Sequence, residues 1–173
     1  SPEQGVAGMV VYKPWMAEKM PTFGLAAWVL HEGVPGHHHQ ISLSQELTDL
    51  PKFRRFGGNY TAYAEGWALY AEYLGKELGL FTDPYQWFGR LNDEQLRAMR
   101  LVVDTGLHSL GWSREKAIRY MVANSPMSES YAASEVERYI SMPGQALGYK
   151  IGDLRLQALR RNAQKELGGK FDV

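Results

Sequence analysis

The sequence predicts a mainly α-helical fold: a multi-helix bundle over residues 1–173 in one domain, with one short β-strand near the N-terminus. Three observations support this fold class. From Pro21 onward, apolar residues recur with helical rather than alternating spacing, residues that favour helix starts precede several of these stretches, and the linkers are short. Short linkers suit antiparallel helices packed side by side.

The strand is predicted over residues 8–15, GMVVYKPW, because β-favouring apolar residues are closed there by a proline. The first helix is predicted over residues 21–45. It should be interrupted at Pro35, because a proline inside a helix removes a backbone donor and clashes with the preceding turn. A second helix is predicted over residues 59–78, and Gly79 ends it.

A third helix is predicted to begin at the sequence TDPYQW, where Asp83 is the expected N-cap and Pro84 stands in the first turn. We expect this helix to run to Gly111, with a break near Asn92. The remaining helices are predicted over residues 113–124 and 128–143, each opened by a capping serine, and over residues 144–167.

The composition argues against several classes of function. Lys and Arg (19) balance Asp and Glu (19), so the sequence gives no sign of a nucleic-acid or membrane-surface partner. No apolar run is long enough to span a bilayer. The chain has no cysteine, so a metal ion would have to be bound by His, Asp or Glu side chains. Cytoplasm and periplasm both suit such a chain, so the compartment stays open.

Residues 26–43, AAWVLHEGVPGHHHQISL, contain four of the five histidines of the chain. On a helix, a His-Glu pair followed by a second histidine one turn later is a zinc-binding pattern. Here the pair, His31 and Glu32, is followed by Gly-Val-Pro-Gly before the next histidine, so the spacing is longer. The alternatives are a surface run like a purification tag or separate polar histidines. Tags stand at termini among polar residues, whereas apolar residues flank this run.

Helix geometry alone leaves the second ligand open between His37 and His38. On a straight helix His38, seven residues after His31, returns to the same face, whereas His37 does not. A bulge at Pro35-Gly36 would absorb the extra residues and bring His37 back to that face. Irregularities of this kind inside helices are frequent at functional sites.

A catalytic zinc site needs a third protein ligand and one open position. Glu65 stands in the apolar stretch NYTAYAEGWALYAEYL, where a carboxylate is costly unless it is paired or bound to a metal. Glu72 lies seven residues further on the same helical face, where it could hydrogen-bond a ligating histidine. The alternative for Glu65 is an ion pair with an Arg or Lys of a neighbouring helix.

Four blocks follow one another along the chain: HEGVPGHHHQ, AEGWALYAE, DTGLHSLGWSREKA and MPGQALGYKIGDLRLQALR. Together they resemble a large bacterial family of unknown function, DUF885, over nearly the whole chain from Pro21 on. That family is grouped with the gluzincin-type zinc peptidases, so the resemblance implies a zincin-like helical bundle. Family members extend further in both directions, so we expect this chain to be the C-terminal catalytic part of a longer protein.

The resemblance also implies roles for the motif residues. His31, His37 and Glu65 would bind one Zn²⁺ per chain, and Glu32 would be the catalytic base. His37 is favoured over His38, because in neighbouring peptidase families a glycine directly precedes the second ligand, as it does here.

The oxyanion formed during peptide hydrolysis needs a hydrogen-bond donor besides the metal, and His108 and Tyr149 are our candidates. His108 is the only histidine outside the 26–43 segment, and Asp104 one turn earlier could fix its tautomer. Tyr149 lies in PGQALGYK, where glycines allow close backbone approach. The alternatives are an interhelical histidine and a core tyrosine. Arg138 could bind a substrate carboxylate, with a structural salt bridge to a glutamate as the competing expectation.

The sequence therefore predicts a zinc-dependent peptidase that acts on a peptide substrate. The alternative is a catalytically silent metal-binding module derived from a peptidase, against which the intact Glu32 argues. A di-iron carboxylate bundle is disfavoured, because no histidine stands three residues after a glutamate. A purely structural helical domain would leave the His-Glu cluster unexplained. Peptide size, cleavage mode and oligomeric state stay open.

Overall fold

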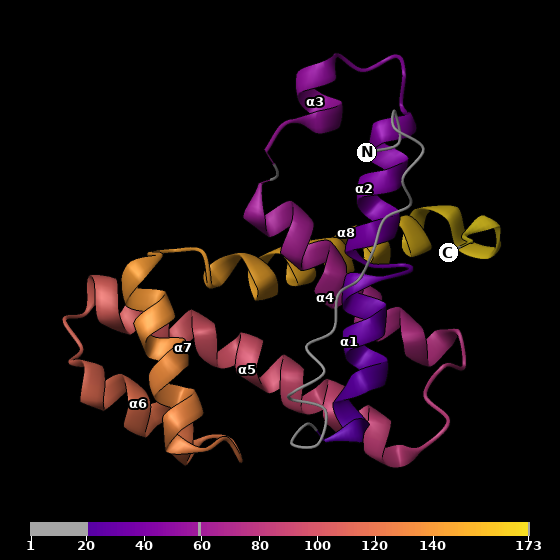
Figure 1. Cartoon of the computed structure of the whole chain (residues 1–173). Helices are drawn as coiled ribbons and strands as arrows, with labels where there is room; N and C mark the ends of the chain where they lie inside the picture. Colours follow the sequence, from indigo (N-terminus) through magenta and orange to yellow (C-terminus); the bar gives the residue numbers. More distant parts are fainter. Residues whose placement is uncertain (1–20, 59, 173) are drawn as a thin grey trace.

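The computed structural model describes residues 21–58 and 60–172. These residues form helices joined by short connections and contain no strand, so the mainly α-helical prediction is confirmed for them (Figure 1). The strand predicted over residues 8–15 lies outside the described residues. In chain order the elements are η3 (Thr22–Gly24), α1 (Leu25–Glu32), α2 (His37–Glu46), α3 (Lys52–Phe56), α4 (Thr61–Glu77), α5 (Pro84–Ser109), α6 (Arg114–Ala123), α7 (Glu129–Ser141), α8 (Leu147–Leu167) and η4 (Gly168–Lys170).

The predicted helix ends are confirmed where capping residues marked them. Asp83 accepts a hydrogen bond from the backbone N–H of Tyr85 at 2.7 Å and opens α5. Ser113 and Ser128 open α6 and α7, and each accepts from the backbone N–H three residues later. Gly79, just beyond α4, has a left-handed φ of +69°, which suits a glycine at a helix end.

The predicted interruption of the first helix is confirmed, because α1 ends at Glu32 and α2 begins at His37. The predicted break near Asn92 is wrong, since α5 runs through it without interruption. A single asparagine costs a helix only about 0.5 kcal/mol, less than the apolar contacts of a long helix supply. The short α3 was not predicted, because its five residues are too few to show a helical pattern, and none of them is buried.

The α4 helix packs against α1 and α8 in the part of the molecule that carries the predicted ligands (Figure 1). It approaches α8 most closely at Gly66 and Gly152. A Cβ atom on Gly66 would lie 2.4 Å from the Cα of Gly152, so no side chain fits between the two backbones there. Glu65 directly precedes Gly66, and its position relative to α8 is fixed by this contact.

The main hydrophobic core lies between α5, α6 and α7, at the other end of the molecule from α2 and α3 (Figure 1). Its fully buried members include Val103, Ala117, Met121, Ala132 and Val136. The long α5 helix connects this core to the α1 and α8 helices. Within the described residues, no helix combines the length and the apolar character that crossing a membrane requires.

Candidate metal centre

The structure brings together the three side chains predicted as metal ligands. His31 lies in the last turn of α1, His37 is the first residue of α2, and Glu65 lies in α4. Glu65 Oε2 is 3.4 Å from His31 Nε2 and 3.2 Å from His37 Nε2, and one ligand atom from each residue lies within 4.8 Å of the other two. Atoms that bind zinc at 2.0–2.1 Å in a tetrahedron are roughly 3.3 Å apart, so the two distances from Glu65 to the histidines fit zinc.

The segment between α1 and α2 explains why His37 rather than His38 joins the cluster. The chain turns so tightly that a Cβ on Gly36 would lie 1.9 Å from the carbonyl oxygen of His31, so only glycine fits there. The indole N–H of Trp67 donates a hydrogen bond to the Pro35 carbonyl oxygen at 2.7 Å and holds this segment against α4. The side chain of His38 is exposed to solvent.

Glu72 lies behind His31, as the sequence suggested. His31 Nδ1 donates a hydrogen bond to Glu72 Oε1 at 2.7 Å, and Glu72 is only 1% exposed. This bond places the Nδ1 proton on the Glu72 side and directs Nε2 toward Glu65. A carboxylate on the outer nitrogen of a ligating histidine is the usual support of zinc sites, because it fixes the ring and raises its basicity. Arg97 of α5 lies 3.8 Å from the same Glu72 oxygen.

The charges of the cluster are strongly coupled. Burial lowers the pKa of His31, but its hydrogen bonds with Glu65 and Glu72 together raise it by more, to about 9. Burial raises the pKa of the Glu65 carboxyl, but hydrogen bonds with His31 and His37 hold it well below its usual range. A carboxylate facing a protonated imidazole is therefore the stable arrangement near neutral pH when no metal is bound. A divalent cation could replace the imidazole proton.

Glu32, the predicted base, shares an open depression of about 430 Å³ with two of the candidate ligands. Residues from α1, α2, α4 and the segment before α8 line it: Glu32, His37, Ile41, Thr61, Ala64, Glu65 and Gln145. The depression therefore brings a carboxylate that could accept protons next to the cluster that could bind a metal.

Tyr149 lies beside the cluster, whereas His108 is held elsewhere. The Tyr149 ring stacks on the His31 ring, with centroids 6.4 Å apart and an interplanar angle of 19°. His108 Nε2 donates to the backbone carbonyl of Tyr139 in α7 at 2.9 Å, and His108 does not line the depression. Asp104, expected to fix the tautomer of His108, instead accepts from the backbone N–H of Gly144 at 3.0 Å. His108 thus has the interhelical role considered as its alternative.

Arg138 contacts Tyr149 rather than a glutamate. Its Nη2 donates to the Tyr149 hydroxyl at 3.1 Å and to Gln145 Oε1 at 3.3 Å. Gln145, which also donates to the Tyr149 hydroxyl at 3.4 Å, was not singled out from the sequence. The only sequence signal for Gln145 was its place in the PGQALGYK block. Trp67 was likewise missed, because a single indole in an apolar helix looks like an ordinary core residue.

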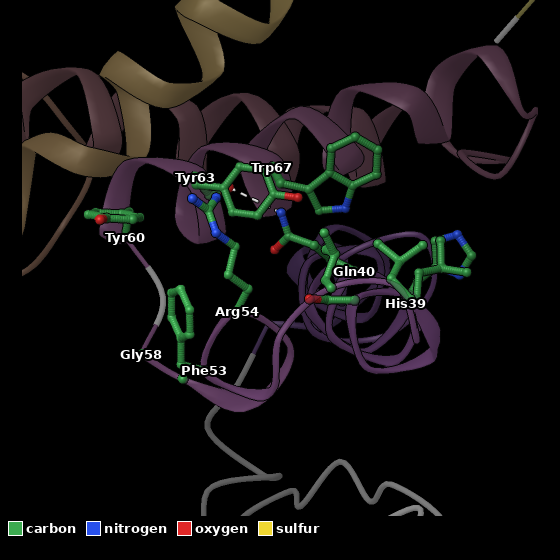
Figure 2. A pocket seen from close by; sticks show the side chains of 13 residues that line it. His39, Gln40, Phe53, Arg54, Gly58, Tyr60, Tyr63 and Trp67 are labelled. Carbon is green, nitrogen blue, oxygen red and sulfur yellow. Dashed lines mark hydrogen bonds between the residues drawn. The ribbon is translucent and has the colours of Figure 1, made fainter.

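A second, larger hollow of about 760 Å³ lies between α2, α3 and α4, lined by residues such as Leu43, Phe53, Tyr63 and Trp67 (Figure 2). Gln40 Nε2 donates to the backbone carbonyl of Tyr63 across it at 3.2 Å. Tyr63 and Trp67 are each two residues from Glu65, which places them on roughly the opposite side of α4. This hollow therefore lies behind the metal cluster rather than in front of it.

Several solved structures are similar to this chain, including the following two. A crystal structure described as "the putative lipoprotein from Colwellia psychrerythraea" is 51% identical with a TM-score of 0.85, covering 88% of this chain and 26% of that one. A structure of "a putative lipoprotein of unknown function from Shewanella oneidensis" is 22% identical with a TM-score of 0.79, covering 96% of this chain and 31% of that one, and it shows the same fold. The chain thus spans about a quarter to a third of these proteins. No curated protein matches it.

The family comparison agrees with the resemblance carried by the four sequence blocks. The model of the family "Bacterial protein of unknown function (DUF885)" matches residues 1–173. The chain therefore belongs to the DUF885 family of bacterial proteins.

Proposed function

We propose that this chain carries the metal site of a zinc-dependent peptidase of the gluzincin type, with His31, His37 and Glu65 as ligands of one Zn²⁺. The observation that carries the proposal is the convergence of these side chains from three helices, with the Glu65 carboxylate 3.2–3.4 Å from both imidazoles. Two imidazole nitrogens and one carboxylate oxygen form a donor set of catalytic zinc sites, which keep a further position open. The Glu72 carboxylate behind His31 supports the same assignment.

Zinc bound here would supply a Lewis acid that polarises the substrate carbonyl and makes water a nucleophile at neutral pH. In the proposal, the Glu32 carboxylate takes a proton from the attacking water and passes it to the amine nitrogen of the leaving group. Glu32 is well placed for both transfers, because it opens onto the same depression as His37 and Glu65. Glu72 keeps the Nδ1 proton of His31 in place, so that Nε2 remains available as a ligand.

We propose that the substrate is a peptide and that these residues form the C-terminal catalytic part of a longer chain. The depression is open, and its walls are formed by a few residues from four segments. Further walls that select peptide length and side chains would come from the rest of the protein. This expectation agrees with the small share of the similar solved structures that the chain covers.

The proposal is tested on the full-length protein by metal analysis and by cleavage of a peptide library with and without a chelator. We expect about one zinc per chain and cleavage that stops when zinc is removed. Glu32→Gln should retain the metal and abolish hydrolysis. Glu46→Gln, which changes an exposed carboxylate at the end of α2, is the matched control and should leave both unchanged.

Two results would reject the peptidase assignment. Full cleavage by Glu32→Gln would exclude Glu32 as the base. Stoichiometric zinc binding without cleavage of any library peptide would instead favour the second candidate, a catalytically silent metal-binding module.

A further inference from the structure

Three side chains form a closed hydrogen-bonded triangle, one corner of which, Gln145, lines the depression. Arg138 of α7 donates to the Tyr149 hydroxyl at 3.1 Å and to Gln145 Oε1 at 3.3 Å, and Gln145 Nε2 donates to the same hydroxyl at 3.4 Å. Gln145 also lines the depression, together with Glu32 and Glu65. The triangle therefore reaches from the α7–α8 connection to the place where a substrate would lie.

The chemistry of the three groups fixes which atoms donate. A guanidinium has only donors, so the oxygen of the Gln145 amide must face Arg138 and its NH₂ group must point the other way. The Tyr149 hydroxyl oxygen accepts hydrogen bonds from Arg138 and from Gln145, so neither bond uses the hydroxyl proton of Tyr149. One N–H of Gln145 and the O–H of Tyr149 are thereby left as donors whose orientation is set by Arg138.

The position of Tyr149 is fixed on all sides. It is 5% exposed, its ring stacks on that of the candidate ligand His31, and the Arg100 guanidinium lies 4.5 Å from its centroid on a cation–π contact. Directly before it, a Cβ on Gly148 would lie 2.7 Å from Thr61 Cγ2, so the start of α8 abuts the first turn of α4 beside the depression. Donors held this rigidly need no reorganisation when charge develops near them.

We propose that Gln145 Nε2 and the Tyr149 hydroxyl act as a donor pair for the oxygen of the reacting carbonyl, and that Arg138 is the positioning residue that orients both. This inference rests on the proposed peptidase function. It adds Gln145 as a residue that contacts the substrate, and it gives Arg138 a different role from the binding of a substrate carboxylate. Loss of a preorganised oxyanion donor lowers kcat by about 10²–10³-fold, whereas the ground-state affinity changes little.

The test uses the zinc-loaded full-length protein and the variants Gln145→Met, Tyr149→Phe, Arg138→Met and Arg138→Lys. Arg161→Met, an exposed residue of α8, is the control. We expect Gln145→Met and Tyr149→Phe each to lower kcat by roughly 100-fold with KM changed by less than about threefold. Arg138→Met should lower kcat by at least ~10-fold, and Arg138→Lys should recover part of it, because lysine can still donate.

A second readout does not depend on turnover. A peptide phosphonate carries tetrahedral anionic oxygens, so its Kd by calorimetry should weaken in parallel with kcat in each variant, while zinc content and the circular-dichroism spectrum stay at the wild-type values. Wild-type kcat and phosphonate affinity in Gln145→Met would overturn the inference while leaving the peptidase proposal intact. It would also be overturned if Arg138→Met raised KM only for peptides with a free C-terminal carboxylate, since that pattern identifies a carboxylate anchor. A wild-type protein without hydrolysis would reject the peptidase proposal itself.

Discussion

Zinc binding to this protein is predicted to displace a proton from His31. In the metal-free protein the ring is held between two carboxylates, with Nδ1 2.7 Å from Glu72 and Nε2 3.4 Å from Glu65. These contacts raise its pKa to about 9, so near neutral pH both nitrogens carry protons. Coordination through Nε2 requires that proton to leave, because a metal ligand must offer a lone pair.

The magnitude follows from the pKa. At pH 7 about 99% of His31 is protonated, compared with roughly a quarter of a histidine with the ordinary pKa of 6.5. Zinc binding should therefore release about one proton from His31. Competition with that proton should weaken zinc binding at pH 7 by roughly two orders of magnitude, on the order of 3 kcal/mol, relative to an unperturbed histidine. Between pH 6.5 and 8.5, deprotonation of His31 alone should strengthen the zinc affinity about tenfold for each unit by which the pH rises.

The assay is calorimetric titration of chelator-treated protein with zinc, in buffers of different ionisation enthalpy that do not bind the metal. Glu72→Gln is the informative variant, because it keeps an oxygen near Nδ1 but removes the charge that helps to raise the His31 pKa. Proton release at pH 7.5 should be smaller in Glu72→Gln than in the wild type. Equal release in the two proteins, or an affinity that does not change with pH, would refute the reasoning.

Three further predictions concern the metal-free fold and the metal site. Because folding raises the pKa of His31 above 6.5, this residue contributes at most about 3 kcal/mol to the free energy of unfolding; the contribution is complete below pH 6.5 and is lost as the pH rises through 9. Urea titrations of the metal-free protein across this pH range should show the decline. Gly66→Ala should lower stability by about 1–3 kcal/mol, because its Cβ would meet the backbone of Gly152, and a melting curve measures the loss. Trp67→Phe keeps a ring but removes the donor to the Pro35 carbonyl oxygen, so the zinc Kd from competition with a chelator should weaken by about tenfold.

Local sequence signals predicted most of the fold. Capping residues such as Asp83 and Ser113, together with Gly79, mark helix ends because each satisfies backbone groups within a few residues. The short α3 and the uninterrupted α5 were not foreseen. In α3 no residue is buried, and in α5 the packing of a long helix outweighs the weak preference of Asn92.

The sequence could predict the part of the candidate site whose side chains are themselves able to bind a metal. His31 and Glu65 are such residues, and both lie in the cluster. The choice of His37 over His38 could not be made from helix geometry, because it depends on the turn at Pro35 and on a contact from Trp67 in another helix. His108 was expected to contact the oxyanion, but it lies away from the depression, and the sequence could not show this for a similar reason. Its hydrogen-bond partner, a backbone carbonyl of α7, lies 31 residues away in sequence, where no local pattern reports it.

Glu65 and Glu72 stand on one helix, two turns apart, and the His31 ring bridges them. The α4 helix thus determines both the position of the Glu65 carboxylate and the orientation of the His31 ring, so a shift of one would shift the other. A one-residue insertion between the two glutamates would rotate Glu72 by about 100° and uncouple the pair, even though every residue type in the motif would be retained. The register of α4, and not merely its composition, is therefore what this centre requires.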